Sequence, residues 1–240
     1  VPVIACECEV CSSLDFRDKR LRSSVHVLTQ DVSLVIDTGP DFRQQMLRER
    51  IKHLDAVLYT HEHKDHTAGM DDVRSFNFKQ KMDIPIYARE RVLNQLKKEF
   101  EYVFAEHKYP GVPQIEANTI TDRPFDINNV TINPIEVLHY KLSVHGFRIG
   151  DFTYITDANS IPEASREKII GSKVVVINAL QREDHISHFT LSEAINLAQE
   201  IDADQTYFTH ISHRLGTHKD VSSELPDKVN LAQDGLKVEI

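Results

Sequence analysis

Four of the six residues in one short run of the chain are potential metal ligands. The run is His61-Glu62-His63-Lys64-Asp65-His66. His61 and His63 are two positions apart, so on an extended segment they point to the same side and can bind one ion. Asp65 and His66 follow directly, where the chain is expected to turn into a helix, and can face a second ion. The spacing predicts two adjacent metal sites that share this loop.

The elements that must position these ligands are strands. Residues 54–60 form an apolar run typical of a buried strand, and three later apolar runs also end at a potential ligand: His139, Asp157 and His210. If these strands are parallel neighbours of the first, all four ends meet at one edge of a sheet. The predicted first ion is held by His61, His63 and His139, and the second by Asp65, His66 and His210. Asp157 is expected to bridge them, because a carboxylate has two oxygens.

This ligand set is mostly imidazole, with few carboxylates and no thiolate. It suits Zn, Mn, Fe or Ni better than Ca or Mg. Two such divalent ions about 3.5–4 Å apart lower the pKa of a water and polarise the attacked group. The predicted chemistry is therefore hydrolysis with two bound metal ions.

The three cysteines of the chain lie together and indicate a second kind of metal site. They form the pattern Cys6-x-Cys8-x-x-Cys11. An odd, closely spaced set is not a disulfide framework, whereas three thiolates can bind zinc, which prefers four tetrahedral ligands. The fourth ligand is expected elsewhere in the chain, and a histidine is the first choice. Reduced cysteines also favour a cytoplasmic location.

The remaining pattern predicts two sheets in a sandwich with helices on the outer faces, because strands dominate the first half and strand–helix alternation the second. Residues 84–88 are predicted to be an edge strand, since Pro85 lacks a backbone donor. Residues 108–118 are predicted to be a loop, and residues 235–240 a last strand.

Composition excludes several classes of function. The chain has 240 residues, of which 40% are hydrophobic, and a net charge of −9, which disfavours a large nucleic-acid partner. No apolar run approaches the roughly 20 residues that span a bilayer, so no membrane partner is expected. The length allows one large domain or two small ones.

Together these ligands resemble the metallo-β-lactamase superfamily, whose pattern is His-x-His-x-Asp-His followed by a His, a bridging Asp and a last His on separate strand ends. The resemblance implies an α/β fold, a four-layered αβ/βα sandwich, formed as a single domain over residues 1–240. Members usually begin with a strand before the cysteines, so we expect that strand to lie upstream of residue 1. His63 stands where the oxidoreductases of this fold carry Glu, which favours hydrolysis.

The cysteines are similar to those of the PhnP-like phosphoribosyl cyclic phosphodiesterase group. In that group a His three residues after the last active-site His completes a structural zinc site, which implies His213 as the fourth ligand here. His218 is the alternative. The group's members often form homodimers.

The resemblance also implies further roles. His188-x-Thr190 is similar to an element whose His helps the leaving oxygen depart from phosphorus, with His185 as the alternative and helix capping as the non-catalytic explanation. Asp65 and Asp157 are the catalytic carboxylates at the ions. Asp37 is expected to orient a ligand imidazole from behind.

The function predicted from all this is a phosphodiesterase with two divalent ions, Zn or Mn and alternatively Fe or Ni, and one structural Zn. Its substrate is expected to be a small cyclic or nucleotide-like phosphodiester. One alternative is a carboxylic-ester, thioester or lactone hydrolase that uses the same metals. An alternative of another class is a non-catalytic metal-binding protein.

Overall fold

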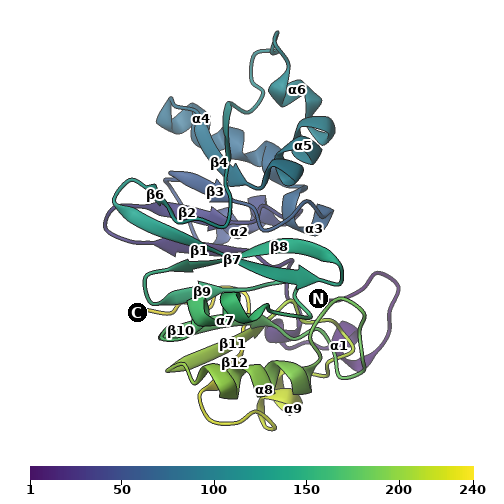
Figure 1. The fold of residues 1–240 in the computed structure, drawn as a ribbon. Coiled ribbons are helices and arrows are strands. Elements are labelled where there is room, and N and C mark those ends of the chain that lie inside the picture. Colours follow the sequence, from purple (N-terminus) through teal and green to yellow (C-terminus); the bar gives the residue numbers. More distant parts are fainter. The chain divides into compact units, whose positions relative to one another are not determined.

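A computed structural model describes all of residues 1–240. The chain divides into two compact units, unit 1 (residues 1–21 and 132–240) and unit 2 (residues 22–131). Figure 1 shows the elements of both, and each unit is described by itself. No helix is long and apolar enough to cross a bilayer.

Unit 2 is built on a five-stranded sheet in the order β1-β2-β3-β4-β5. β1 and β2 are antiparallel, and β2 to β5 run parallel to one another. The elements are β1 (Val25–Leu28), β2 (Ser33–Ile36), α2 (Phe42–Arg48), β3 (Ala56–Leu58), α3 (Lys64–Thr67), the 3-10 helix η2 (Met70–Val73), α4 (Arg74–Gln80), β4 (Ile84–Ala88), α5 (Glu90–Glu99), α6 (Glu101–Phe104), β5 (Ile115–Thr119) and β6 (Phe125–Ile127).

The core of unit 2 explains why these segments form helices and strands. β2 and β3 are buried at every position and consist of apolar residues apart from Ser33, as expected for parallel strands covered by helices. α5 is amphipathic: Val92, Leu93 and Leu96 face the core, while charged residues occupy the other side. The apolar face of α5 therefore fixes this helix on the sheet.

Unit 1 contributes the strands from β12 to β7 of a seven-stranded sheet ordered β12-β11-β10-β9-β8-β7-β6. β9 to β12 are parallel, and β8 is antiparallel to both β7 and β9, so β7 runs in the same direction as β9. The elements are α1 (Glu9–Ser12), the 3-10 helix η1 (Phe16–Asp18), β7 (Val130–His139), β8 (Leu142–Ile149), β9 (Phe152–Tyr154), α7 (Glu163–Ile169), β10 (Val174–Asn178), α8 (Leu191–Ile201), β11 (Gln205–Thr209), α9 (His218–Ser222) and β12 (Val229–Leu231).

Four expectations about the strands are wrong. β4 is not an edge strand but lies between β3 and β5. The backbone N–H of Ile84 donates to Gln114 on the β5 side, so the next residue, Pro85, faces β3. The pairing of β3 with β4 starts only at Ile86, so no hydrogen bond is lost at Pro85. The predicted loop at 108–118 contains the start of β5. The last strand is β12, and residues 235–240 form no strand.

The fourth error concerns the ligand-bearing strands. β3, which precedes the His61–His66 loop, belongs to the first sheet, whereas β7, β9 and β11 belong to the other. The strand that delivers the loop is thus not a parallel neighbour of the other three. Within unit 1, however, β7, β9 and β11 do run in one direction, so their ends reach the same edge of the sheet.

Candidate metal centres

The ligand loop of unit 2 follows β3 and ends in the short helix α3, as its spacing predicted. His61 Nε2 lies 3.0 Å from His63 Nδ1, and the rings of His61 and His66 have their centroids 4.4 Å apart. Two nitrogens bound to one tetrahedral zinc are roughly 3.3 Å apart, because Zn–N bonds are about 2.0–2.1 Å long. The His61 and His63 nitrogens are therefore already spaced to share an ion.

Asp37 lies behind this loop and orients two of its imidazoles. Its Oδ2 accepts from His66 Nδ1 at 2.7 Å and from the Thr60 hydroxyl at 2.8 Å. Because the Thr60 proton is used in this way, its oxygen accepts from His61 Nδ1 at 3.0 Å. The network places protons on both Nδ1 atoms and leaves the Nε2 atoms of His61 and His66 as ligands.

Asp37 itself is fully buried, in a strained position at the end of β2. Its backbone φ is 65°, in the left-handed region that costs a non-glycine residue about 1–3 kcal/mol. Burial raises the pKa of Asp37, while the charge and hydrogen bond of His66 and the donors of Thr60 act in the opposite direction. A strained, buried carboxylate surrounded by donors fits an orienting role.

Two glycines allow the ligand loop to pack closely against the turn after β2. A Cβ atom on Gly39 would lie 2.3 Å from the backbone oxygen of Asp65, and one on Gly69 would lie 2.2 Å from the backbone oxygen of Gly39. Neither position can therefore hold a side chain without displacing backbone. This close approach also sets Arg22 beside Asp65, with Nη1 3.5 Å from Oδ2.

Unit 1 brings together a second set of potential ligands at the ends of β7, β9 and β11. His139 Nδ1 donates to the Ser187 carbonyl at 2.9 Å, which leaves its Nε2 as the ligand atom. Asp157 and His210 follow their strands with φ values of 55° and 51°, and His210 Nε2 lies 3.3 Å from Asp157 Oδ1. The ligand atoms of His139, Asp157 and His188 all lie within 4.8 Å of one another.

His188 is part of this set. It is only 8% exposed, and its Nε2 lies 3.0 Å from Asp157 Oδ1. Its ring stacks on that of His210, with centroids 5.0 Å apart. His185 lies behind His188 as seen from the Asp157 carboxylate, with its Nδ1 3.1 Å from His188 Nδ1. Burial lowers the pKa of His185.

Neither His185 nor His188 caps α8. The cap is Thr190, whose hydroxyl accepts from the Glu193 backbone at 3.2 Å while the Glu193 carboxylate accepts from the Thr190 backbone at 2.8 Å. This reciprocal capping box satisfies the free donors of the helix end. The helix-capping explanation for the two histidines is therefore wrong.

The cysteine segment of unit 1 surrounds His213. Its Nδ1 lies 3.2 Å from Cys6 Sγ and 3.5 Å from both Cys8 Sγ and Cys11 Sγ. A tetrahedral zinc with Zn–S bonds of about 2.3 Å requires roughly 3.5 Å between such atoms. A backbone hydrogen bond from Cys11 lowers the pKa of the Cys8 thiol to about 6, which favours the thiolate that binds metal. These four residues fit one zinc ion.

The alternative ligand, His218, is engaged elsewhere. Its Nδ1 accepts from Arg20 Nη2 at 2.7 Å, and its backbone N–H donates to Asp18 Oδ1 at 2.6 Å at the start of α9. Burial and the nearby Arg20 lower the pKa of His218. The group of potential ligand atoms formed by the three cysteines contains His213 and not His218.

Comparison with known proteins places the chain in a family. The model of the beta-lactamase superfamily domain matches residues 33–211, about three quarters of the chain. The chain belongs to the metallo-β-lactamase superfamily. The predicted α/β class with two sheets is confirmed, and so is the resemblance to the PhnP group.

Three relatives illustrate the family's range. The solved structure of a new diphosphatase from the PhnP family is 40% identical and covers 99% of this chain and 91% of its own, with a TM-score of 0.93. Zinc-bound PqqB from Methylobacterium extorquens is 18% identical over 100% of this chain and 96% of its own, with a TM-score of 0.79, and shows a shared fold. An octanoyltransferase from Porphyromonas gingivalis (strain ATCC BAA-308 / W83) is 35% identical over 99% of this chain. The chain spans about half, 48%, of the length of that curated relative.

Several supporting residues of this metallo-β-lactamase chain were missed by sequence reasoning. They are Thr60 behind the ligand loop, Ser187 behind His139, and Asn178, whose side chain bonds the backbone N–H and carbonyl of Ala158 at 2.8 and 2.9 Å. Asn178 thereby fixes the turn just after Asp157. Only its place at the end of the apolar strand β10 could have indicated it, because an isolated polar residue there needs a partner.

Proposed function

We propose that this chain is a metal-dependent phosphodiesterase that hydrolyses a small cyclic or nucleotide-like substrate with two divalent ions. The observation that carries this proposal is its 40% identity, over 99% of its length, to the PhnP-family diphosphatase. A diphosphatase and a phosphodiesterase both hydrolyse a P–O bond, the first in a P–O–P linkage and the second in a P–O–C linkage. The proposal therefore includes diphosphate diesters among the candidate substrates.

The proposed ligands come from both units. One ion would be held by His61, His63 and His139, the other by Asp65, His66 and His210, and Asp157 would contact both. The orientation of the imidazoles supports this assignment: His61, His66 and His139 each direct Nδ1 toward a protein acceptor and keep Nε2 for a metal. Zinc or manganese suits such donors. A separate structural zinc is assigned to Cys6, Cys8, Cys11 and His213.

The two ions, when bound, would acidify a water and polarise the phosphoryl oxygens. Water then adds to phosphorus and one P–O bond breaks, so the leaving oxygen needs a proton. His188 is the proposed donor. Its Nε2 lies 3.0 Å from Asp157 Oδ1, beside the proposed ions, and the neighbouring Ser187 hydroxyl, 3.1 Å from Nδ1, holds the ring in place.

The test is a substrate panel on protein loaded with manganese or zinc. Bis(p-nitrophenyl) phosphate, a cyclic phosphodiester and a dinucleoside diphosphate are compared with lactones and thioesters, with Asp65→Ala as the control. We expect turnover of at least one phosphorus substrate that Asp65→Ala abolishes. Turnover of lactones or thioesters alone would overturn the phosphodiesterase assignment, and no metal-dependent turnover at all would favour a non-catalytic metal protein.

The proton donor is tested by His188→Ala, with His185→Ala as the matched variant. We expect kcat to fall by about 10²–10⁴-fold in His188→Ala, the usual contribution of a general acid, and to change less in His185→Ala. Metal content by elemental analysis must stay unchanged in both. If His188→Ala loses metal, His188 is a ligand, and if His185→Ala has the larger effect, the two roles are reversed.

A second candidate is hydrolysis of a carboxylic thioester or ester on the same metals. The observation that favours it is the name of the curated relative, an octanoyltransferase, which points to acyl chemistry in that protein. Because this chain matches only about half of that relative, the name supports the candidate less than the diphosphatase supports the first. An octanoyl thioester belongs in the substrate panel for this reason.

A further inference from the structure

The potential ligands of the His61–His66 loop alternate with two charged residues, Glu62 and Lys64. Both form ion pairs with α5: Glu62 Oε2 lies 3.2 Å from Arg91 Nη2, and Lys64 Nζ lies 2.7 Å from Glu99 Oε2. The two carboxylate oxygens in these pairs are shielded from solvent. The cations remain partly in water, since the Arg91 side chain is 40% and the Lys64 side chain 63% exposed, so each pair is weakened by water and salt and its expected effect is modest.

The partners on α5 form one stripe along the helix. Arg91, Gln95 and Glu99 are spaced four residues apart, so they share a face that extends for about 12 Å at 1.5 Å per residue. Gln95 Nε2 donates to Glu99 Oε1 at 2.8 Å and so fixes the carboxylate that receives Lys64. Although burial opposes it, the hydrogen bonds from Lys64 and Gln95 lower the pKa of Glu99.

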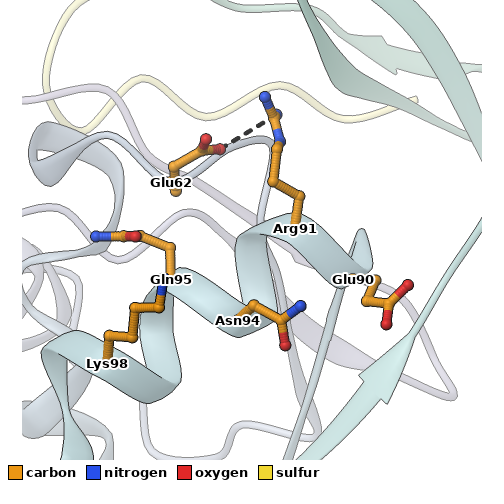
Figure 2. A pocket seen from close by; sticks show the side chains of 6 residues that line it. All are labelled: Glu62, Glu90, Arg91, Asn94, Gln95 and Lys98. Atoms are coloured by element: carbon orange, nitrogen blue, oxygen red, sulfur yellow. Dashed lines mark ion pairs between the residues drawn. The ribbon is translucent and has the colours of Figure 1, made fainter.

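Figure 2 shows the Glu62 end of this contact. Arg91 reaches from α5 toward the Glu62 carboxylate across a hollow of about 480 Å³, which Glu90, Asn94, Gln95 and Lys98 also line. Among the six residues drawn, the one marked ion pair joins Arg91 to Glu62, and Lys98, further along the same helix, forms no pair with Glu62. Two cations, Arg91 and Lys98, line the same hollow, and Arg91 is the one that pairs with Glu62.

The order of charges fixes the register of the loop. Along the loop the signs are negative at Glu62 and positive at Lys64, and the facing residues of α5 are positive at Arg91 and negative at Glu99. A shift of the loop by two residues would bring like charges together. Repulsion against the wrong alignment adds to attraction in the right one.

We propose that α5 acts as a template that sets the position of the metal-ligand loop through the pairs Glu62–Arg91 and Lys64–Glu99. The four residues are positioning residues: none belongs to a group of potential metal ligands, and each acts through the backbone of the ligands beside Glu62 and Lys64. This inference rests on the proposed function, because it assumes that the loop binds ions. Replacing a residue that hydrogen-bonds to a metal ligand typically weakens metal affinity by about 10–100-fold. We expect an effect of about 10-fold here, because the ion pairs contact residues next to the ligands rather than the ligands themselves.

The experiment compares Arg91→Glu, the double variant Glu62→Arg/Arg91→Glu and the control Lys98→Glu. Lys98→Glu makes the same charge change on the same helix and hollow but removes no pair with the loop. Manganese affinity is measured from the loss of the free-ion electron paramagnetic resonance signal, with the structural zinc retained. Unfolding midpoints are measured without manganese.

We expect Arg91→Glu to weaken manganese binding about 10-fold, the double variant to recover most of that loss, and Lys98→Glu to stay within about twofold of wild type. Wild-type affinity in Arg91→Glu, or no recovery in the double variant, would overturn the inference. A loss of affinity that follows only the fall in unfolding midpoint would do the same, because it would indicate general destabilisation. If the wild-type chain bound neither manganese nor any zinc beyond the structural ion, the proposed function would fail instead.

Discussion

The His61–His66 loop and the Cys6–Cys11 segment each place several potential ligands within six residues, but the structure supports them differently. Behind the loop lie a buried strand and a buried carboxylate, Asp37, which accepts a hydrogen bond from His66 directly and holds His61 through the Thr60 hydroxyl. The cysteine segment has exposed or half-buried sulfurs that accept from backbone N–H groups, and no buried carboxylate lies behind them. Its proposed fourth ligand, His213, is 202 residues beyond Cys11.

This difference indicates two uses of a metal. Oriented ligands with fixed tautomers are needed where an ion must hold a defined geometry during a reaction. A cluster that joins residues about 200 positions apart instead restrains the chain, because closing a long loop removes conformational entropy from the unfolded state. Changes at the two regions should therefore be separable, with the cysteine segment governing stability and the loop governing the reactive ions.

The largest effect is expected for Cys8→Ala. Loss of a structural metal belongs to the most destabilising class of substitutions, about 4 kcal/mol, which corresponds to a fall of about 10 °C in Tm for a chain of this length. Zinc content should fall by one ion per chain. The measurement is thermal unfolding by circular dichroism, together with elemental analysis.

The controls for Cys8→Ala are the two histidines. His213→Ala should reproduce the zinc loss, and His218→Ala should keep the zinc. Turnover measured well below the lowered Tm should remain near that of wild type. An unchanged Tm and zinc content in Cys8→Ala would remove the structural role of this site and with it the contrast between the two regions.

An intermediate effect is expected for Asp37→Asn. Both carboxylate oxygens accept hydrogen bonds, Oδ2 from His66 Nδ1 and the Thr60 hydroxyl and Oδ1 from the Thr60 backbone N–H. An amide has only one acceptor oxygen, so its NH2 group must face a donor at one of the two positions, and the imidazoles of His61 and His66 lose their orientation. Affinity for manganese should fall by about 10–100-fold, as for other groups that hydrogen-bond to ligands, with the cysteine-bound zinc unaffected. Titration calorimetry on protein that retains its structural zinc measures the dissociation constant for manganese.

Asp41→Asn is the matched control for this change. Asp41 lies four residues further along the chain, and its Oδ2 accepts from the Arg22 backbone at 2.8 Å rather than from a ligand. Its variant should bind manganese as wild type does. Equal affinity in Asp37→Asn and Asp41→Asn would mean that the buried network does not orient the loop.

The sequence predicted the loop well because its potential ligands are contiguous and follow an apolar strand. Asp37 and His213 were anticipated only through the family resemblance, because nothing local connects a residue to a partner 29 or 207 positions away. Thr60 was missed because a threonine at a strand end has no sequence signal until its hydrogen bonds are known. The ion pairs with α5 were missed for the same reason: charges on a helix surface are usually solvated.

The order of the strands in the sheet also could not be predicted from the sequence. Pro85 indicated an edge strand, since a proline cannot donate to both neighbours. In the structure β4 is central and tolerates Pro85, because β3 is short and its pairing with β4 starts only at Ile86, two residues after the pairing of β4 with β5. The length of a neighbouring strand is a property of the packed sheet, so the exception could not be predicted from Pro85 itself.

The smallest effect concerns the surroundings of the cysteine segment, where Arg20 donates to His218. His218 faces Arg20, Arg17, Asp15 and Asp18, and burial together with the arginines lowers its pKa below the ordinary value of 6.5. Below pH 6.5 the unfolded chain therefore binds a proton that the folded chain does not, so this group supports the fold fully above pH 6.5 and less as the pH falls.

His218→Gln tests that dependence, because the amide oxygen still accepts from Arg20 but does not titrate. Tm should match wild type at pH 8, and between pH 8 and pH 5.5 the wild-type Tm should fall by about 1–3 °C more than that of the variant. The pair is compared by scanning calorimetry at both pH values, with zinc content checked at each. Parallel falls in the two proteins would show that His218 stays neutral without cost, and a loss of zinc in the variant would return His218 to the list of ligands and weaken the distinction between the two regions.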